Sequence, residues 1–203
     1  MISDTTRVAV TGGIGSGKSF VCQRLKDRGI EVFNCDDVAK WLMRERRDLQ
    51  RRLVRLVGKD LYTDGRLNKA VMARFILASV DNAQRVDAIV HPAVAEAFVE
   101  SPFQWMECAI LFESGFDRLV DKIIYVDAPL ETRIERIMQR DNISREKALE
   151  WIHRQMDPEE AKQRSHFVIL NDGTANIDSQ LDGLLGQALN GQEQEYTIIN
   201  NHK

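Results

Sequence analysis

The sequence predicts an α/β fold in which helices cover a parallel β-sheet. Two observations support this prediction. Short apolar runs alternate with amphipathic helical patterns along most of the chain, and the first apolar run passes through a glycine-rich loop into a helix. Residues 58–102 interrupt the alternation, because they are helical and charged without a strand pattern. The length of 203 residues suits one such domain with an inserted helical subdomain.

The first strand–loop–helix unit is the most specific feature of the sequence. Val8–Val10 is predicted to be a strand, and Gly12-x-x-x-x-Gly17-Lys18-Ser19 matches the phosphate-binding pattern G-x-x-x-x-G-K-[ST]. Glycines let several backbone N–H groups face one anion, and the helix N-terminus adds its partial positive charge. We expect Lys18 to reach the β- and γ-phosphates of a nucleotide and Ser19 to ligate Mg²⁺. The residues predicted to contact the nucleotide at this loop are Gly13, Ile14, Gly15, Ser16, Gly17, Lys18, Ser19 and Phe20.

Carboxylates follow three of the other predicted strands. They are Asp36 and Asp37 after the strand 30–33, Glu113 after the strand 106–112, and Asp127 after the strand 122–126. Ligands of open α/β sheets collect beyond the carboxyl ends of the strands. We therefore expect Asp36 or Asp37 to be functional. Either Glu113 or Asp127 could hold Mg²⁺ through water, and Glu113 is favoured. The alternative is that these acids cap the following helix or turn.

The inserted block of residues 58–102 is predicted to form two helices. They cover residues 68–78 and 81–100, and the second is expected to be interrupted at His91-Pro92, because proline removes a helix hydrogen bond. By analogy with other folds of this class, such an insertion holds the second substrate. The predicted division is a nucleotide-binding core of residues 1–57 and 103–190, a subdomain of residues 58–102 and a flexible tail of residues 191–203.

A row of arginines follows the fourth predicted strand. Arg133, Arg136 and Arg140 are spaced i, i+3, i+7 in the helical pattern 129–140, so they share one face. Near a phosphate loop, such a row can clamp the charge that develops on a transferred phosphoryl group. The alternative is a solvated face paired with neighbouring acids. A second charged helix follows after a short turn, and residues 136–160 are predicted to form a mobile lid.

Charge and cysteine content narrow the functional class. The net charge of −3 argues against nucleic acid or an anionic membrane as the main partner. No apolar stretch reaches the ~18 residues needed to span a bilayer, and the N-terminus does not read as a signal peptide. Cys22, Cys35 and Cys108 form neither a metal pattern nor a disulfide framework, so a cytoplasmic protein with inert thiols is expected. A monomer is favoured, and Cys35 is a candidate reactive thiol because it precedes Asp36.

Over roughly residues 8–190 the chain resembles dephospho-coenzyme A kinases. Its separated motifs follow the order of that family. They are the loop Thr11–Ser19, Gly29–Val32 followed by Asp36, Ile89–Pro92, Ile110–Glu113, Arg140-Asp141, Gln155, and Val168-Ile169 with Asn171 and Gly173.

This resemblance implies a P-loop kinase fold with a five-stranded parallel sheet, a helical coenzyme-A-binding subdomain and a helical lid. It also implies that ATP, with Mg²⁺, phosphorylates the ribose 3′-hydroxyl of dephospho-coenzyme A to give coenzyme A and ADP. The motif match makes Asp36 the expected general base, with Lys18 and Arg140 as the other catalytic residues. The further residues it implies are Arg136 and Asn171 for the nucleotide, and Asp36, Lys69, His91 and Glu113 for the substrate.

The chain departs from the family pattern in places, and other functions stay open. The departures include Asn34 in place of an acid, Phe20 in place of threonine, Lys69 in place of arginine and Leu170 in place of an acid. One alternative is a kinase for a nucleoside monophosphate or another small metabolite. Another is a nucleotide-dependent switch or binding module, although Asn68-Lys69 lacks the acid of a guanine-binding Asn-Lys-x-Asp motif.

Overall fold

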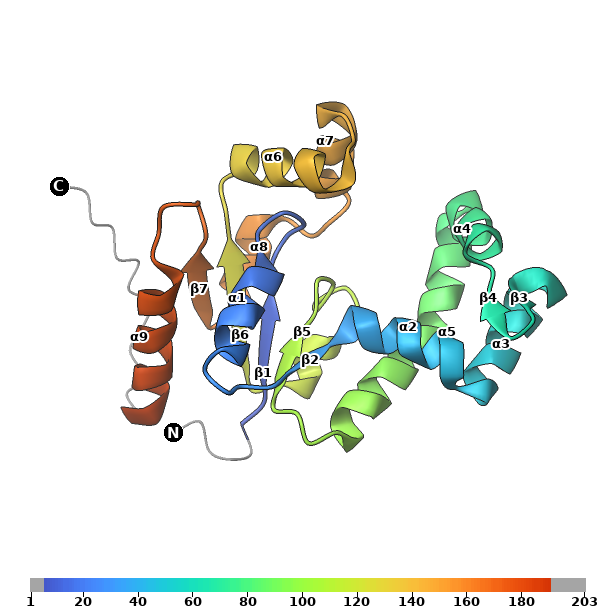
Figure 1. Ribbon diagram of the computed structural model, residues 1–203, viewed down its shortest axis with the longest axis horizontal. Helices are drawn as coiled ribbons and strands as arrows, with labels where there is room; N and C mark the ends of the chain where they lie inside the picture. Colours follow the sequence, from blue (N-terminus) through green and yellow to red (C-terminus); the bar gives the residue numbers. More distant parts are fainter. Residues whose placement is uncertain (1–5, 191–203) are drawn as a thin grey trace.

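A five-stranded parallel sheet forms the centre of the protein, whose computed structural model describes residues 6–190 (Figure 1). The strands are β1 (Val8–Thr11), β2 (Val32–Asn34), β5 (Trp105–Glu107), β6 (Lys122–Asp127) and β7 (Phe167–Leu170). Their order across the sheet is β2-β5-β1-β6-β7, and each neighbouring pair is parallel. Parallel strands need crossover connections, which the intervening helices supply. The predicted α/β class is therefore confirmed.

The sheet separates two hydrophobic clusters, because successive side chains of a strand point to opposite faces. In β1, Val8 and Val10 belong to one cluster, whereas Ala9 belongs to the other. Helices α1 (Lys18–Lys26) and α9 (Ile177–Asn190) cover the first face and contact each other. The loop between β1 and α1 is thereby held between two buried elements.

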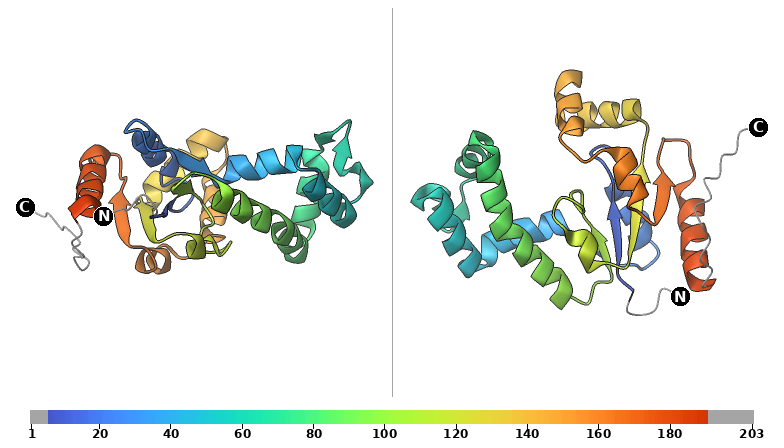
Figure 2. Two further views of the ribbon diagram at one scale, coloured as in Figure 1. Left: turned by 90° about the horizontal axis from the view of Figure 1, so that it is seen from below. Right: turned by 180° about the vertical axis from the view of Figure 1, so that it is seen from behind.

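The second cluster continues into a helical part that stands to one side of the sheet (Figures 1 and 2). Its elements are α2 (Cys35–Glu45), α3 (Arg47–Val57), η1 (Lys59–Leu61), α4 (Lys69–Ala78) and α5 (Val80–Glu100). Phe98 of α5 packs edge to face on Phe33 of β2, with ring centroids 5.2 Å apart. Helix α3 packs against α4 and α5, although the sequence analysis assigns it to the core. The division between residues 57 and 58 stays a prediction.

Helix α5 is continuous through Pro92, contrary to the predicted interruption. A proline removes one helix hydrogen bond, but buried residues on both sides hold α5 against the second cluster. These residues are Val86, Val90, Ala93, Val94 and Phe98. Neither α5 nor any other helix in the described part of the chain is long and apolar enough to cross a membrane.

A short antiparallel hairpin lies in the insertion, where no strand was predicted. It consists of β3 (Tyr62–Thr63) and β4 (Arg66–Leu67). The connecting residues Asp64 and Gly65 both have positive φ, 49° and 75°. Two consecutive positive φ values are typical of the tight turns that favour Asp-Gly, and this turn closes the hairpin.

Strand β5 is shorter than the predicted strand 106–112, because it ends at Glu107. The neighbouring strands β1 and β2 end within one residue of the positions opposite Glu107. The residues after Glu107 therefore have no strand to pair with. The apolar residues that follow adopt turns, from which Leu111 is fully buried in the core. Glu107, and not Glu113, therefore stands at the carboxyl end of this strand.

Three helices follow β6; the first two lie beyond the carboxyl ends of the strands, and the third packs against β6 (Figure 1). They are α6 (Leu130–Asp141), α7 (Arg145–His153) and α8 (Pro158–Gln163). α6 and α7 pack on each other through a small separate cluster that includes Ile134, Ile137 and Ile152. Ile14 of the loop joins this cluster, so the predicted lid rests on the loop. That it moves stays a prediction.

Candidate active site

The loop between β1 and α1 is shaped by glycines. Gly17 is the N-cap of α1, with φ 90° and ψ 29°, a conformation that residues with a Cβ rarely adopt. A Cβ on Gly17 would clash with the amide of Asn171, and a Cβ on Gly13 would clash with the guanidinium of Arg133. The first N–H groups of α1 have no partner within the helix, so the loop and the helix start can together receive an anion.

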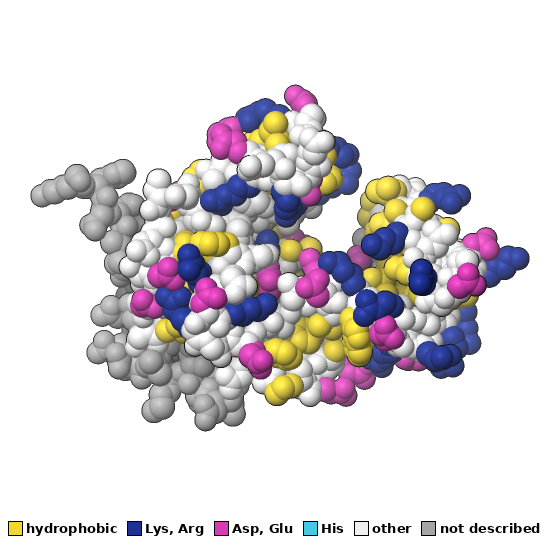
Figure 3. Space-filling view, in the orientation of Figure 1, with side chains coloured by type: hydrophobic (Ala, Val, Ile, Leu, Met, Phe, Trp, Pro, Cys, Tyr) yellow, Lys and Arg dark blue, Asp and Glu magenta, His cyan; other side chains and the backbone are white. Residues whose placement is uncertain are grey.

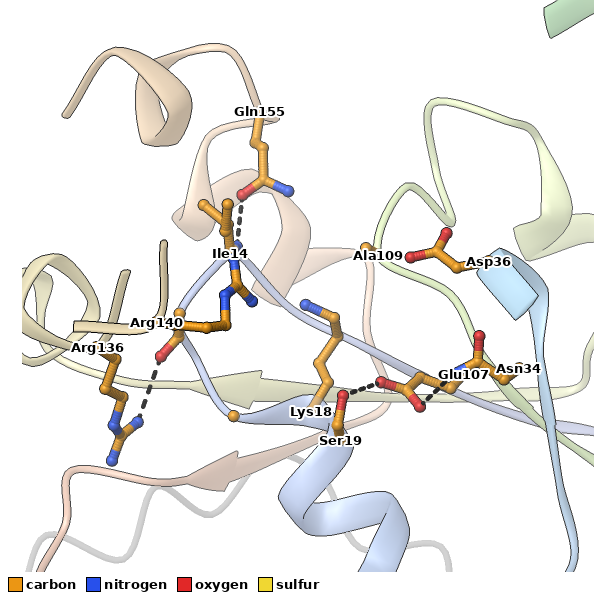
Figure 4. Close-up of a pocket in the computed structure, with 12 residues that line it drawn as sticks. Ile14, Lys18, Ser19, Asn34, Asp36, Glu107, Ala109, Arg136, Arg140 and Gln155 are labelled. Carbon is orange, nitrogen blue, oxygen red and sulfur yellow. Dashed lines mark hydrogen bonds between the residues drawn. The ribbon is translucent and has the colours of Figure 1, made fainter. Parts of the chain in front are cut away.

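A pocket of about 460 Å³ lies where the loop, α2, the end of β5 and the lid meet (Figure 4). In the space-filling view this region is hollowed between the lid and the helical part (Figure 3). The volume is within the usual range for small-molecule sites. Its lining residues are Ile14, Gly15, Gly17, Lys18, Ser19, Asn34, Asp36, Glu107, Ala109, Arg136, Arg140 and Gln155.

The Lys18 side chain folds back over the loop. Its ammonium donates hydrogen bonds to the carbonyl oxygens of Gly12 at 2.8 Å and Gly13 at 3.1 Å. Burial of the ammonium lowers the pKa of Lys18, while the nearby carboxylates of Glu107 and Asp36 act in the opposite direction. A cation is thus held at the phosphate loop with two acidic side chains close to it.

Glu107 joins the phosphate loop to β2. The Ser19 hydroxyl donates a 2.8 Å hydrogen bond to its Oε1, and the Asn34 amide donates a 3.0 Å bond to its Oε2 (Figure 4). The Asn34 Oδ1 in turn accepts from the N–H of Asp37 at 3.0 Å and caps α2. An aspartate at position 34 could cap the helix but could not donate to Glu107. Asn34 therefore supplies both the cap of α2 and a hydrogen-bond donor to Glu107.

Sequence reasoning did not select Glu107. The apolar run was expected to continue as a strand to Glu113, which placed Glu107 inside the sheet. The available signal was a charged residue within an otherwise apolar strand, since such residues are seldom buried without a partner.

Asp36 and Asp37 have different surroundings. Asp36 lies in the first turn of α2, and its carboxylate points into the pocket (Figure 4). Asp37 is exposed and pairs with Lys40 at 3.2 Å. Because Asn34 is the N-cap of α2, the alternative that either acid serves as its cap does not hold. Asp36 is the one of the two acids that lines the pocket.

Two arginines of α6 hold the loop by its carbonyl groups. Arg133 is buried, and its Nε donates to the Ile14 carbonyl at 2.9 Å. Arg136 donates to the carbonyls of Ser16 at 3.3 Å and Asn171 at 3.0 Å. Asn171 is also buried, and its amide donates to the Ser16 carbonyl at 2.8 Å. The predicted shared arginine face is thus turned toward the loop, and desolvation lowers the pKa of Arg133.

The remaining lid contacts come from Arg140 and Gln155. Arg140 lines the pocket and pairs with Asp141 at 2.7 Å on the exposed side of the lid. Gln155 lies between α7 and α8, and its Oε1 accepts a 2.6 Å hydrogen bond from the N–H of Ile14. One side chain of the lid thereby binds an amide of the phosphate loop directly (Figure 4).

Phe20 and Glu113, both predicted site residues, do not line the pocket. Phe20 is 47 % exposed, and the guanidinium of Arg24 lies 5.0 Å from the centroid of its ring. Glu113 accepts a 3.3 Å hydrogen bond from the N–H of Met156. Its expected place at a strand end was wrong, because β5 stops earlier.

Lys69 and His91 also lie outside the pocket. Lys69 is exposed at the start of α4, next to the hairpin. His91 is half-buried in α5, 3.5 Å from the carboxylate of Asp87 and with its ring against that of Phe116. Their roles stay predictions.

Comparison with known proteins identifies the family. A family model described as dephospho-CoA kinase matches residues 6–176. The chain belongs to the dephospho-CoA kinase family. The dephospho-CoA kinase of Bacteroides fragilis (strain YCH46) is 40% identical over 186 residues, which cover 86% of this chain and 89% of the relative. That of Thermus thermophilus is 31% identical over 191 residues, which cover 91% of this chain and 92% of the relative.

Solved structures share the fold of this chain. A crystal structure of a Thermus thermophilus protein has a TM-score of 0.76 at 31% identity and covers 90% of this chain and 97% of its own. A shikimate kinase from Acinetobacter baumannii, at 12% identity, has a TM-score of 0.54 with coverages of 95% and 98%, which shows a shared fold alone. The predicted P-loop kinase fold is confirmed, and this dephospho-CoA kinase is an ATP-dependent phosphotransferase.

Proposed function

We propose that this protein transfers the γ-phosphoryl group of ATP to the ribose 3′-hydroxyl of dephospho-coenzyme A, giving coenzyme A and ADP. Family membership supports the reaction. The observation that carries the proposal is that a phosphate loop with its lysine and the carboxylate of Asp36 face one pocket. A phosphoryl donor and a proton acceptor for the attacking hydroxyl can meet there.

Asp36 acts as the general base. A carboxylate within hydrogen-bond reach accepts the proton of the acceptor hydroxyl as it attacks the phosphorus. Residues 13–19 of the loop bind the triphosphate, with Phe20, Arg136 and Asn171 on the nucleotide side. Lys18 reaches the β- and γ-phosphates, and Arg140 stabilises the charge on the transferred group. Arg136 and Asn171 support this arrangement by binding the carbonyl groups of the loop.

The oxygen atoms of Ser19 and Glu107 fit a magnesium ion. The described residues contain no cluster of three or more His, Cys, Asp or Glu suited to a metal, and Mg²⁺ in such kinases is held by one or two side chains together with substrate phosphates and water. Ser19 and Glu107 would hold the ion, directly or through water. When bound, Mg²⁺ neutralises charge on the β- and γ-phosphates.

The acceptor is bound by the helical part together with Asp36. We propose Lys69, His91 and Glu113 as substrate-side residues, with residues 58–102 as the coenzyme-A-binding subdomain. Lys69 and His91 lie in α4 and α5, which pack on α2, α3 or each other, so the subdomain is joined through α2 to Asp36. The protein acts as a monomer in the cytoplasm.

An acceptor panel tests the proposal. ADP release is measured with ATP and Mg²⁺ and with dephospho-coenzyme A, AMP, CMP or shikimate as acceptor. We expect release with dephospho-coenzyme A alone, and transfer of a radiolabel from the γ-phosphate of ATP to coenzyme A. Lys18→Ala should reduce the rate by orders of magnitude, and Arg140→Ala should lower kcat more than it raises the KM for ATP. Preference for a nucleoside monophosphate would support another small-molecule kinase, and acceptor-independent hydrolysis would support a nucleotide switch.

A further inference from the structure

Two cysteines lie side by side behind the wall of the pocket. Cys35 is the first residue of α2, directly after β2, and Cys108 directly follows β5. In the parallel pairing of these strands Asn34 is opposite Glu107, so Cys35 and Cys108 are the next residues in register. Neighbouring strands are ~4.8 Å apart, and a disulfide joins Cα atoms ~4.4–6.8 Å apart. The backbone spacing therefore permits a bond between them.

The register of β2 and β5 and the shared hydrophobic cluster place the two thiols next to each other. Each thiol influences the pKa of the other, which lowers the pKa of Cys108 and raises that of Cys35. Both belong to the same hydrophobic cluster and are 5 % and 2 % exposed. Cys22 is also buried, but it belongs to the cluster on the opposite face of the sheet. Cys35 and Cys108 thus form a pair from which the third cysteine is excluded.

The residues on either side of each cysteine form part of the pocket wall. Cys35 lies between Asn34 and Asp36, and Cys108 lies between Glu107 and Ala109; all four neighbours line the pocket. A small oxidant in the pocket would therefore contact the residues on both sides of each cysteine. A bond between the sulfur atoms would act on both Asp36 and Glu107.

We propose that Cys35 and Cys108 are a reversible oxidation site, at which hydrogen peroxide forms a disulfide that lowers the kinase activity. The first thiol attacks the O–O bond and becomes a sulfenic acid, and its proton leaves with the displaced hydroxide as water. The second thiol displaces the sulfenic hydroxyl, which leaves with the second proton as water. Two thiols and one peroxide give one disulfide and two waters, and two electrons pass from sulfur to peroxide.

The loss of activity follows from geometry. A disulfide bond is ~2.05 Å long with a restricted dihedral angle, shorter than any non-covalent contact of the two sulfurs. Its formation draws the first turn of α2 toward the end of β5. A displacement of about 1 Å at reacting groups can cost ~10²-fold in rate, so a strong effect on turnover is expected without loss of the fold.

The experiment exposes the full-length protein to increasing hydrogen peroxide, followed by alkylation and mass spectrometry. We expect a mass loss of two hydrogens, a cross-linked peptide containing Cys35 and Cys108, at least a tenfold fall in turnover, and recovery with dithiothreitol. Cys22→Ser should behave like the wild type. The double variant Cys35→Ser/Cys108→Ser should resist inactivation.

Several outcomes would overturn the proposal. They are oxidation without the Cys35–Cys108 peptide, a mapped disulfide without a change in turnover, or equal inactivation of the double variant. Peptide mapping on the wild type keeps the proposal testable if the double variant does not fold. The mapping does not depend on which acceptor is phosphorylated, so a failure of the proposed reaction is distinguishable from a failure of the oxidation site.

Discussion

Single side chains in this pocket have roles set by their nearest neighbours. Asp36 and Asp37 are adjacent in sequence, yet Asp36 lines the pocket and Asp37 pairs with Lys40 at the surface. The first turn of a helix rotates successive side chains by about 100°, so two neighbouring residues cannot both face the loop. Glu107 likewise depends on the donors Ser19 and Asn34. Substitutions that keep the size of a carboxylate side chain and remove its charge can therefore distinguish the role of each acid from that of its neighbour.

Asp36→Asn is expected to reduce kcat by ~10²–10⁴-fold, because the amide cannot accept the proton of the acceptor hydroxyl. Asp37→Asn is the matched control and should stay within about twofold of the wild type, since only an exposed ion pair is lost. Both are measured as initial rates of ADP release at saturating substrates. Near-normal turnover of Asp36→Asn would remove the assigned base.

Glu107→Gln is expected to raise the Mg²⁺ concentration for half-maximal activity by about tenfold or more, which corresponds to ~1.4 kcal/mol. The amide keeps the shape of the side chain but removes the charge next to Ser19. Glu113→Gln, which changes the acid outside the pocket, should leave the Mg²⁺ dependence unchanged. If only Glu113→Gln changed the Mg²⁺ dependence, the metal would be assigned to Glu113, as first expected from the sequence.

At the scale of elements, the lid and the phosphate loop form one contact network. Arg133 and Arg136 of α6 bind loop carbonyls, Ile14 packs among the lid isoleucines, and Gln155 binds the Ile14 amide. The arginine face was predictable because its spacing is a property of the helix alone. The binding of Gln155 was not, because it joins residues 141 positions apart in the chain.

Gln155→Ala is expected to raise the KM for ATP by roughly 2- to 12-fold, since one hydrogen bond contributes about 0.5–1.5 kcal/mol. The matched control is Gln139→Ala, which removes an exposed glutamine from the same lid. Steady-state kinetics with varied ATP give both values. An equal change in the two variants would show that the hydrogen bond to Ile14 does not position the lid.

At the scale of the whole molecule, the chain joins a sheet and a helical part through one continuous hydrophobic cluster. That cluster contains Phe33 of β2, Leu53 of α3 and Phe98 of α5. Strand β7 forms the other edge of the sheet and pairs with β6.

His166 lies just before β7, and its Nδ1 accepts a 3.1 Å hydrogen bond from the N–H of Ile123. Only a neutral imidazole can accept this bond, so the edge of the sheet is sensitive to pH.

Burial, assisted by the charge of Lys122, lowers the pKa of His166 below its usual 6.5. The unfolded chain then binds more protons than the folded one, so the free energy of unfolding falls as the pH drops through and below about 6.5. We expect denaturant midpoints to decrease between pH 7.5 and pH 5, and His166→Asn to reduce this dependence. His153→Asn, at an exposed histidine in the lid, is the control. An unchanged pH dependence in His166→Asn would contradict the assignment.

The sequence by itself determined the α/β class, the phosphate loop and the place of Asp36 beyond a strand end, whereas the roles expected of Lys18 and Ser19 stay predictions. These conclusions rest on local patterns, since residue spacing dictates which backbone amides converge and which side chains share a helix face. The tertiary structure decided where β5 ends, and with it that Glu107 rather than Glu113 lies at the pocket. It also placed Cys35 beside Cys108. The end of β5 depends on where the neighbouring strands β1 and β2 end. The pairing of Cys35 with Cys108 depends on two segments that are distant in the sequence. Neither feature can therefore be predicted from a single stretch of the sequence.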